Sequence, residues 1–201
     1  NASPARVEAR LHLAVALATL GENAAANAEF ARGFDALART TTVACIPCMP
    51  KWAARLEVWA RSRQSVFQTD TGELDKAMES AEHAMSLAID ALGQDHPDTQ
   101  GAVVHASMAL QASGRNKEAI ALLQDALAER QKVLKERHWQ TIATADNLAQ
   151  AMESDGQLQQ AEAMYRRWLS IAEQSLEAQN PELATIKANL GNLLFRQGRV
   201  E

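Results

Sequence analysis

The residues best suited to chemistry in this chain are Cys45 and Cys48, which form the motif Cys-Ile-Pro-Cys. Such a C-x-x-C pair can be a redox couple or half of a zinc site. Zinc needs four ligands, and no second pair of cysteine or histidine lies nearby in the sequence. A thioredoxin-like couple needs a βαβ setting, which the surrounding sequence does not offer. We therefore expect either a local disulfide or two idle thiols, with redox sensing as the less favoured alternative.

The compartment stays open at this point, because a disulfide between these cysteines would indicate an oxidising one. The five histidines offer no metal-ligand spacing; they are His12, His83, His96, His105 and His138. No G-x-S-x-G, P-loop or H-E-x-x-H motif occurs. The sequence therefore predicts no catalytic residue, no metal site and no cofactor.

The bulk composition narrows the classes of partner. The formal net charge is −5, which argues against a nucleic-acid binder, since such proteins usually carry a basic face. The longest apolar run, Leu11–Leu20, contains His12 and falls short of the roughly 18 residues that a membrane span requires. Hydrophobic residues make up 47% of the chain and aromatic residues 4%. Small aliphatic side chains therefore dominate, and they allow helices to approach closely.

One segment returns along the chain at a fixed interval. His96-Pro-Asp-Thr is repeated as His138-Trp-Gln-Thr and, more loosely, as Asn180-Pro-Glu-Leu, in two steps of 42 residues. Four glycines follow the same step: Gly72, Gly114, Gly156 and Gly198. A fixed period in this range is typical of stacked repeat proteins. The equivalent His96 and His138 are therefore expected to be structural.

Apolar residues at three- and four-residue steps predict nine helices between these turns. Asn180 and Pro181 add a cap and a proline suited to a helix start. The step from Gly21 to Gly72 is nine residues longer than the others, and a loop over 39–50, rich in threonine and proline, holds the insertion. The predicted helices span 4–19, 22–38, 51–68, 73–92, 99–112, 115–134, 141–154, 157–176 and 183–196.

Small and large residues alternate around each turn glycine. Five residues after each glycine stands an alanine; these are Ala26, Ala77, Ala119 and Ala161. Four residues further on, in the same predicted helix, stand Phe30, Ala81, Leu123 and Tyr165. Seven and eight residues before it stand pairs such as Ser107 with Ala106 and Ala149 with Leu148. A small residue beside a larger one lets two helices cross closely.

This pattern resembles the tetratricopeptide repeat, in the 42-residue variant of kinesin light chains and their bacterial relatives. Three further segments carry the resemblance: Asn147-Leu-Ala, Tyr165-Arg-Arg and Asn189-Leu-Gly. The resemblance implies an all-α fold, a right-handed α-solenoid of antiparallel helix pairs. We expect a single repeat domain over 1–201, cut from a longer protein because the sequence stops where another helix should begin. Its repeats would span about 4–38, 51–92, 99–134, 141–176 and, in part, 183–201.

In this family the first helix of each pair (helix A) lines a concave groove that holds a peptide or protein partner. The resemblance implies that the groove is lined by the residues nine, six and two positions before each turn glycine. Asn147 and Asn189 match the family's peptide-gripping asparagine, whose amide can both donate and accept. The bland alternative is that they are solvated or bonded to neighbouring helices. The remaining groove positions are His12, Arg63, His105, Val15, Val66, Met108, Gln150, Asn192, Thr19, Asp70, Ala112, Ser154 and Arg196.

Three roles fit such a module. The first is a protein-interaction or sensor module of a larger, bacterial regulator, with no nucleic-acid or membrane contact. The second is the regulatory arm of an enzyme whose catalytic domain lies outside this segment, and the third is an assembly module that forms a homodimer through its last helix. Of the four tryptophans, Trp168 is expected to be packed between repeats. Trp139 is expected to be exposed, and partner binding by Trp139 or Trp59 is a less favoured reading.

Overall fold

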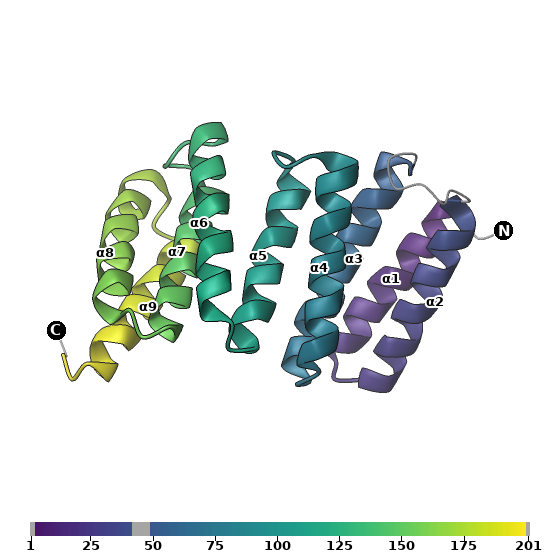
Figure 1. Ribbon diagram of the computed structural model, residues 1–201, viewed down its shortest axis with the longest axis horizontal. Coiled ribbons are helices and arrows are strands. Elements are labelled where there is room, and N and C mark those ends of the chain that lie inside the picture. The colour runs from purple at the N-terminus through teal and green to yellow at the C-terminus, as the bar shows by residue number, and fades with distance from the viewer. Residues whose placement is uncertain (1–2, 42–48, 200–201) are drawn as a thin grey trace. The chain divides into compact units, whose positions relative to one another are not determined.

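The computed structural model describes residues 3–41 and 49–199, and within these residues every regular element is an α-helix. The chain divides into two compact units, which we call unit 1 (residues 1–113) and unit 2 (residues 114–201). Figure 1 shows the helices of each unit running side by side as antiparallel pairs. Unit 1 holds α1 (Pro4–Thr19), α2 (Asn23–Thr41), α3 (Lys51–Asp70), α4 (Leu74–Leu92) and α5 (Pro97–Ala112). Unit 2 holds α6 (Asn116–Val133), α7 (Trp139–Ser154), α8 (Leu158–Ser175) and α9 (Pro181–Arg196).

The predicted loop over 39–50 begins too early in the chain. Helix α2 continues to Thr41. The Thr40 hydroxyl donates to the Ala36 carbonyl at 2.7 Å, and the Thr41 hydroxyl donates to the Leu37 carbonyl at 3.0 Å. Thr41 is also buried, so these β-branched residues extend the helix instead of ending it. Cys45 and Cys48 lie outside the described residues.

Three helices begin two residues earlier than their apolar pattern indicates, because a side chain caps each one. Nδ1 of His96 accepts from the Asp98 amide at 3.2 Å, and Nδ1 of His138 accepts from the Gln140 amide at the same distance. Asn180 Oδ1 accepts from the Glu182 amide at 2.9 Å. A cap of this kind satisfies one of the free N–H groups at a helix start. The structural role predicted for His96 and His138 is thus a capping role.

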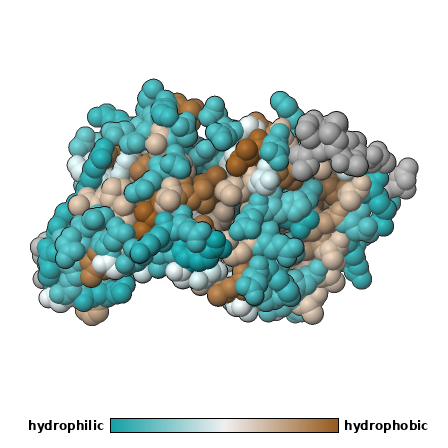
Figure 2. Space-filling model, in the orientation of Figure 1, coloured by the Kyte–Doolittle hydropathy of each residue, from teal (hydrophilic) through white to brown (hydrophobic). Residues whose placement is uncertain are grey.

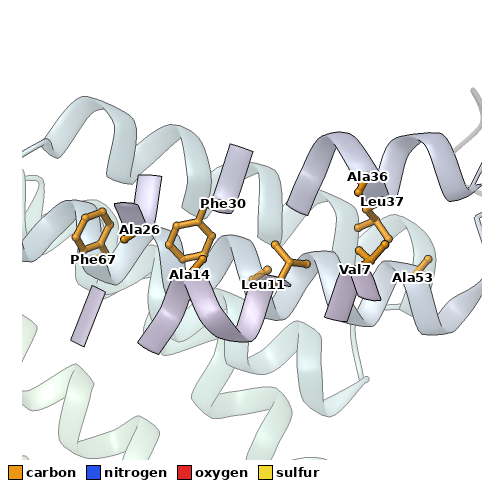
Figure 3. Close-up of a cluster of buried hydrophobic side chains, with 10 residues drawn as sticks. Val7, Leu11, Ala14, Ala26, Phe30, Ala36, Leu37, Ala53 and Phe67 are labelled. Carbon is orange, nitrogen blue, oxygen red and sulfur yellow. The ribbon is translucent and has the colours of Figure 1, made fainter. Parts of the chain in front are cut away.

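In unit 1, the core forms where α1, α2 and α3 meet. Figure 3 shows its side chains in a row, with Phe30 between Ala14 and Ala26. Leu11 packs so closely on Gly33 of α2 that a Cβ at Gly33 would stand 2.4 Å from a Leu11 methyl carbon. The helices can therefore approach only because Gly33 has no side chain. A second buried group joins α3, α4 and α5 through Val58, Ala84, Leu87, Ala88 and Ala102.

In unit 2, larger side chains fill the space between helices. Trp168 and Tyr165 of α8 are both 1% exposed, so the predicted burial of Trp168 is confirmed. Arg130 of α6 is buried as well, at a place where Ala88 and Ala172 stand in other repeats. Its Nη1 donates to the Gln140 carbonyl at 2.7 Å and also bonds the Thr144 hydroxyl, which fastens the end of α6 to the start of α7.

The small and large positions around the turn glycines are buried as their pattern predicts. The alanines five residues after each glycine are at most 1% exposed. Leu13 differs, at 48% exposed, because no described helix precedes α1 to cover it. The face drawn in Figure 2 is mostly hydrophilic, with hydrophobic residues in separate patches. The interior of each unit is therefore made by the repeat pattern itself.

Lys135 holds a backbone conformation that suits glycine. Its φ is 69°, and Gly93, one repeat earlier, has a φ of 93°. A side chain at positive φ costs roughly 1 kcal/mol or more. We expect Lys135→Gly to raise the free energy of unfolding by about 1 kcal/mol, measured by urea denaturation. The reverse change, Gly93→Lys, should lower it. Equal stability of Lys135→Gly and the parent would contradict the argument from backbone strain.

Candidate functional site

The groove positions of unit 1 lie on α1, α3 and α5, and two clefts open beside them. The larger cleft holds about 370 Å³ and is lined by Glu8, His12, Trp52, Arg55, Leu56, Trp59 and Asp98. The smaller one holds about 130 Å³ and is lined by Val58, Trp59, Ser62, Arg63, Pro97, Asp98, Gly101, Ala102 and His105. Three residues placed in the groove from the sequence therefore line a cleft: His12, Arg63 and His105.

Aromatic rings make up much of the wall of the larger cleft. The rings of His12 and Trp59 lie 4.3 Å apart, centroid to centroid, and are tilted by 43°. Trp52 is two helical turns before Trp59 on α3 and is 42% exposed. Nε of Arg55 bonds Oδ2 of Asp98 at 2.6 Å, which joins α3 to α5. Sequence reasoning considered Trp59 as a binding residue but missed Trp52, although the seven-residue spacing puts both on one face.

His105 stands at the edge of the smaller cleft as a neutral imidazole. Burial, and then the nearby charge of Arg63, lower the pKa of His105 to about 4. Its Nδ1 is buried and has no hydrogen-bond partner among the described residues. At neutral pH this ring therefore presents hydrogen-bonding capacity without charge.

The next groove row of unit 1 is apolar. Val15 and Val66 are half-buried, and Met108 is 43% exposed. The last row, nearest the turns, is exposed and mixed in character: Thr19, Asp70 and Ala112. Unit 1 thus offers a ligand aromatic and aliphatic contacts with a few polar groups.

The groove positions of unit 2 lie on α7 and α9, and they are polar. Asn147 and Gln150 of α7 are half-buried, and Asn192 of α9 is exposed. Asn189 Nδ2 donates to Oδ2 of Asp146 at 2.9 Å. Asn189 therefore follows the alternative given above for the two asparagines, in which the amide bonds a neighbouring helix. For Asn147 and Asn192 the described residues supply no side-chain hydrogen bond, so their amides remain available to a ligand.

Polar contacts between successive A helices recur at a separation of 43 residues. We call them rungs: Arg55 with Asp98 in unit 1, and Asp146 with Asn189 and Glu153 with Arg196 in unit 2. In the third rung the distance from Arg196 Nη1 to Glu153 Oε1 is 2.6 Å. Two predicted groove residues, Asn189 and Arg196, are thus engaged in structural contacts.

Asp146 is the polar residue that sequence reasoning missed. It is 4% exposed, and its Oδ1 has no hydrogen-bond partner within the described chain. Burial raises the pKa of Asp146 to about 6, against the lowering effect of the Asn189 hydrogen bond, and Glu182 adds to the rise. A signal existed in the sequence: ten residues before the glycine, the other repeats carry uncharged residues, Leu11, Ser62, Val104 and Ala188.

No group of three metal-ligating side chains forms in the part of the chain that the structure describes. Within the same residues, no helix is long and apolar enough to cross a bilayer. Trp139 is 49% exposed, as the sequence predicts, and lies at the start of α7 beside His138, with 6.0 Å between the ring centroids.

The raised pKa of Asp146 makes a prediction about stability. A carboxyl whose pKa is higher folded than unfolded holds its proton more tightly in the fold, so stability falls as pH rises from about 4 to about 6. Asp146→Asn removes the titration and keeps an oxygen for Asn189. We expect this variant to gain about 2 kcal/mol over the parent at pH 7 and little at pH 4.

Guanidinium denaturation of both proteins between pH 4 and pH 7.5 measures this difference. Asp125→Asn, at an exposed position of α6, serves as the control for the loss of one negative charge. A constant difference between the Asp146→Asn variant and its parent at every pH would contradict the prediction.

Two protein-family models, each described as tetratricopeptide repeat, match the chain, one over residues 102–174 and again over 141–201, the other over 68–98. Together these segments span about two thirds of the chain. A search of curated proteins gave no match.

Three solved structures share the fold. A Podospora anserina protein described as a kinesin light chain with nearly identical repeats has a TM-score of 0.77 and 21% identity, over 98% of this chain and 90% of that one. A variant of the same protein has a TM-score of 0.77 and 20% identity, over 98% and 89%. BtubC (BKLC) from P. vanneervenii has a TM-score of 0.75 and 20% identity, over 98% and 76%. The prediction of an all-α solenoid of helix pairs is confirmed.

Proposed function

The chain belongs to the tetratricopeptide repeat family, and from this premise we propose that it binds a segment of a protein partner along the exposed faces of its A helices. Tetratricopeptide repeats generally serve as scaffolds for protein–protein interaction. The observation that carries the proposal is the row of available polar groups on α7 and α9. Asn147 and Asn192 hold side-chain amides that no described residue engages, at positions where a peptide backbone would find both a donor and an acceptor.

The two units offer different chemistry to such a segment. In unit 1 the groove positions are apolar or aromatic in part, with Met108 exposed beside the clefts. In unit 2 they are amides, one serine and one arginine. We infer a ligand with an apolar part and a polar part, each recognised by one unit.

We also propose that these are repeats of the kinesin-light-chain-like, 42-residue kind, from a bacterial protein. Glycines with positive φ at 72, 114, 156 and 198 support the period, and the caps at His96 and His138 support the connection between repeats. On this proposal the segment is the interaction or sensor module of a larger regulator and performs no reaction itself. The regulatory arm of an enzyme differs from it in the domain attached, so the full-length gene sequence separates the two.

The groove is tested with peptides selected on the purified chain from a random 12-residue display library. We expect Asn147→Ala together with Asn192→Ala to weaken the selected peptides about tenfold, since two hydrogen bonds at roughly 0.5–1.5 kcal/mol each would be lost. Isothermal titration calorimetry gives the affinities. Asn189 and Gln150 are left unchanged, because each donates a hydrogen bond to the buried carboxylate of Asp146.

Gln160→Ala, on the exposed surface of α8, is the matched control and should leave the affinity unchanged. If no peptide is enriched, or if those enriched ignore every groove substitution in both units, the proposal fails.

Self-association is a second candidate function, favoured by one observation. Phe195 near the end of α9 is 73% exposed, although it is a large apolar residue on an A helix. A homodimer that paired the α9 surfaces would bury it. Light scattering over a concentration series should then show growth in mass, which Phe195→Ser reduces. A strict monomer up to about 100 µM would exclude this role for α9 at ordinary affinities.

A further inference from the structure

We propose that the larger cleft of unit 1 binds an arginine side chain of the partner segment, held between Trp52 and Trp59 with its charge toward Glu8. The inference rests on the proposed function and names the chemistry of one part of the ligand.

The walls are suited to a flat cation. Trp52 and Trp59 lie on one face of α3, and both line the cleft with Leu56 between them in sequence. Guanidinium groups stack favourably on aromatic rings, most of all on tryptophan. Unit 1 already contains one such contact, since the guanidinium carbon of Arg61 lies 4.0 Å from the ring centroid of Phe34.

The free charge in the cleft is negative. Nε of Arg55 bonds Oδ2 of Asp98 at 2.6 Å, so the positive charge of Arg55 is balanced by Asp98. Glu8 lies 3.9 Å from Nε2 of His12, which is too long for a hydrogen bond, and 61% of its side chain is exposed. Its carboxylate therefore keeps its accepting capacity for a ligand that donates.

The charge of the unit favours the same ligand. Residues 1–113 contain nine lysines and arginines against thirteen aspartates and glutamates, a net charge of −4, whereas the whole chain carries −5. A surface of this sign attracts cations and repels acidic peptides. The lining of the larger cleft has the same sign, because it contains two carboxylates, Glu8 and Asp98, and one guanidinium, Arg55.

The neighbouring cleft continues the path for the ligand backbone. Trp59 and Asp98 belong to both clefts, so one extended segment can cross from one to the other. Gly101 lines the smaller cleft from within α5, and nothing lies within 4 Å of a Cβ placed there. A glycine inside a helix costs roughly 0.5–1 kcal/mol relative to alanine, and at Gly101 no close contact requires it. Its effect is to leave the smaller cleft open.

The four tryptophans of the chain allow this proposal to be tested by NMR, with a tryptophan outside the cleft as an internal control. Protein labelled with 5-fluorotryptophan gives one fluorine NMR signal for each, and single Trp→Phe variants assign them. The probe is the capped peptide Gly-Ser-Arg-Ser-Gly, compared with versions carrying citrulline or glutamate instead of arginine. Trp139 is about as exposed as Trp52 and reports unspecific stacking on an accessible ring.

We expect the arginine peptide to shift the Trp52 and Trp59 signals in a saturable way, at concentrations at which Trp139 does not respond. Citrulline keeps the shape of arginine without its charge, and it should bind at least about threefold more weakly. Glu8→Gln should weaken the arginine peptide by about threefold, with a smaller effect at high salt. Glu82→Gln, on the exposed side of α4, should have no effect.

Three results would overturn the proposal: equal shifts at Trp52 and Trp139, equal affinity for the arginine and citrulline peptides, or tighter binding of the glutamate peptide. The last would indicate an acidic partner for this cleft. The failure of this inference is distinct from that of the proposed function. Selected peptides that respond to Asn147→Ala with Asn192→Ala but ignore Glu8→Gln would refute the arginine site and leave the groove function standing.

Discussion

The structure depends on close contact between helices at a few small side chains. In α2, α4 and α8, the alanine five residues after the turn glycine is fully or almost fully buried, and it lets this second helix of a pair approach the first. Dispersion and the removal of apolar surface from water act only at such short range. Gly33 is the extreme case of such close packing, because the Leu11 side chain fills the place where a Cβ of residue 33 would be. The faces of the A helices that take no part in these contacts stay accessible to solvent and to a ligand.

The sequence predicts the fold well because the repeat pattern reports these contacts directly. The turn glycines mark where each pair reverses, and the residues counted from them are buried or exposed as expected in nearly every repeat. Leu13 shows that a position's burial also depends on a neighbouring helix. The helix starts before Pro97, Trp139 and Pro181 are less visible to apolar periodicity, because a capping side chain sets each one.

The candidate site is less predictable, since it consists of residues that depart from the pattern. Asp146 stands where other repeats carry uncharged residues, and its environment follows from burial and from Asn189 one repeat away. The larger cleft combines three helices, so its lining emerges only when α1, α3 and α5 are placed together. Spacing indicates which residues share a face, but it does not show which of them already bond one another.

The rungs make the contacts between neighbouring A helices sensitive to the solvent. Each one joins neighbouring A helices through a single polar contact, and Arg196 and Arg55 reach their partners from largely exposed positions. Dissolved ions screen such exposed pairs, with a Debye length of about 10 Å at 0.1 M salt. Higher ionic strength therefore weakens the two rungs that are ion pairs, Arg55 with Asp98 and Glu153 with Arg196. The buried apolar contacts between the same helices are not screened in this way.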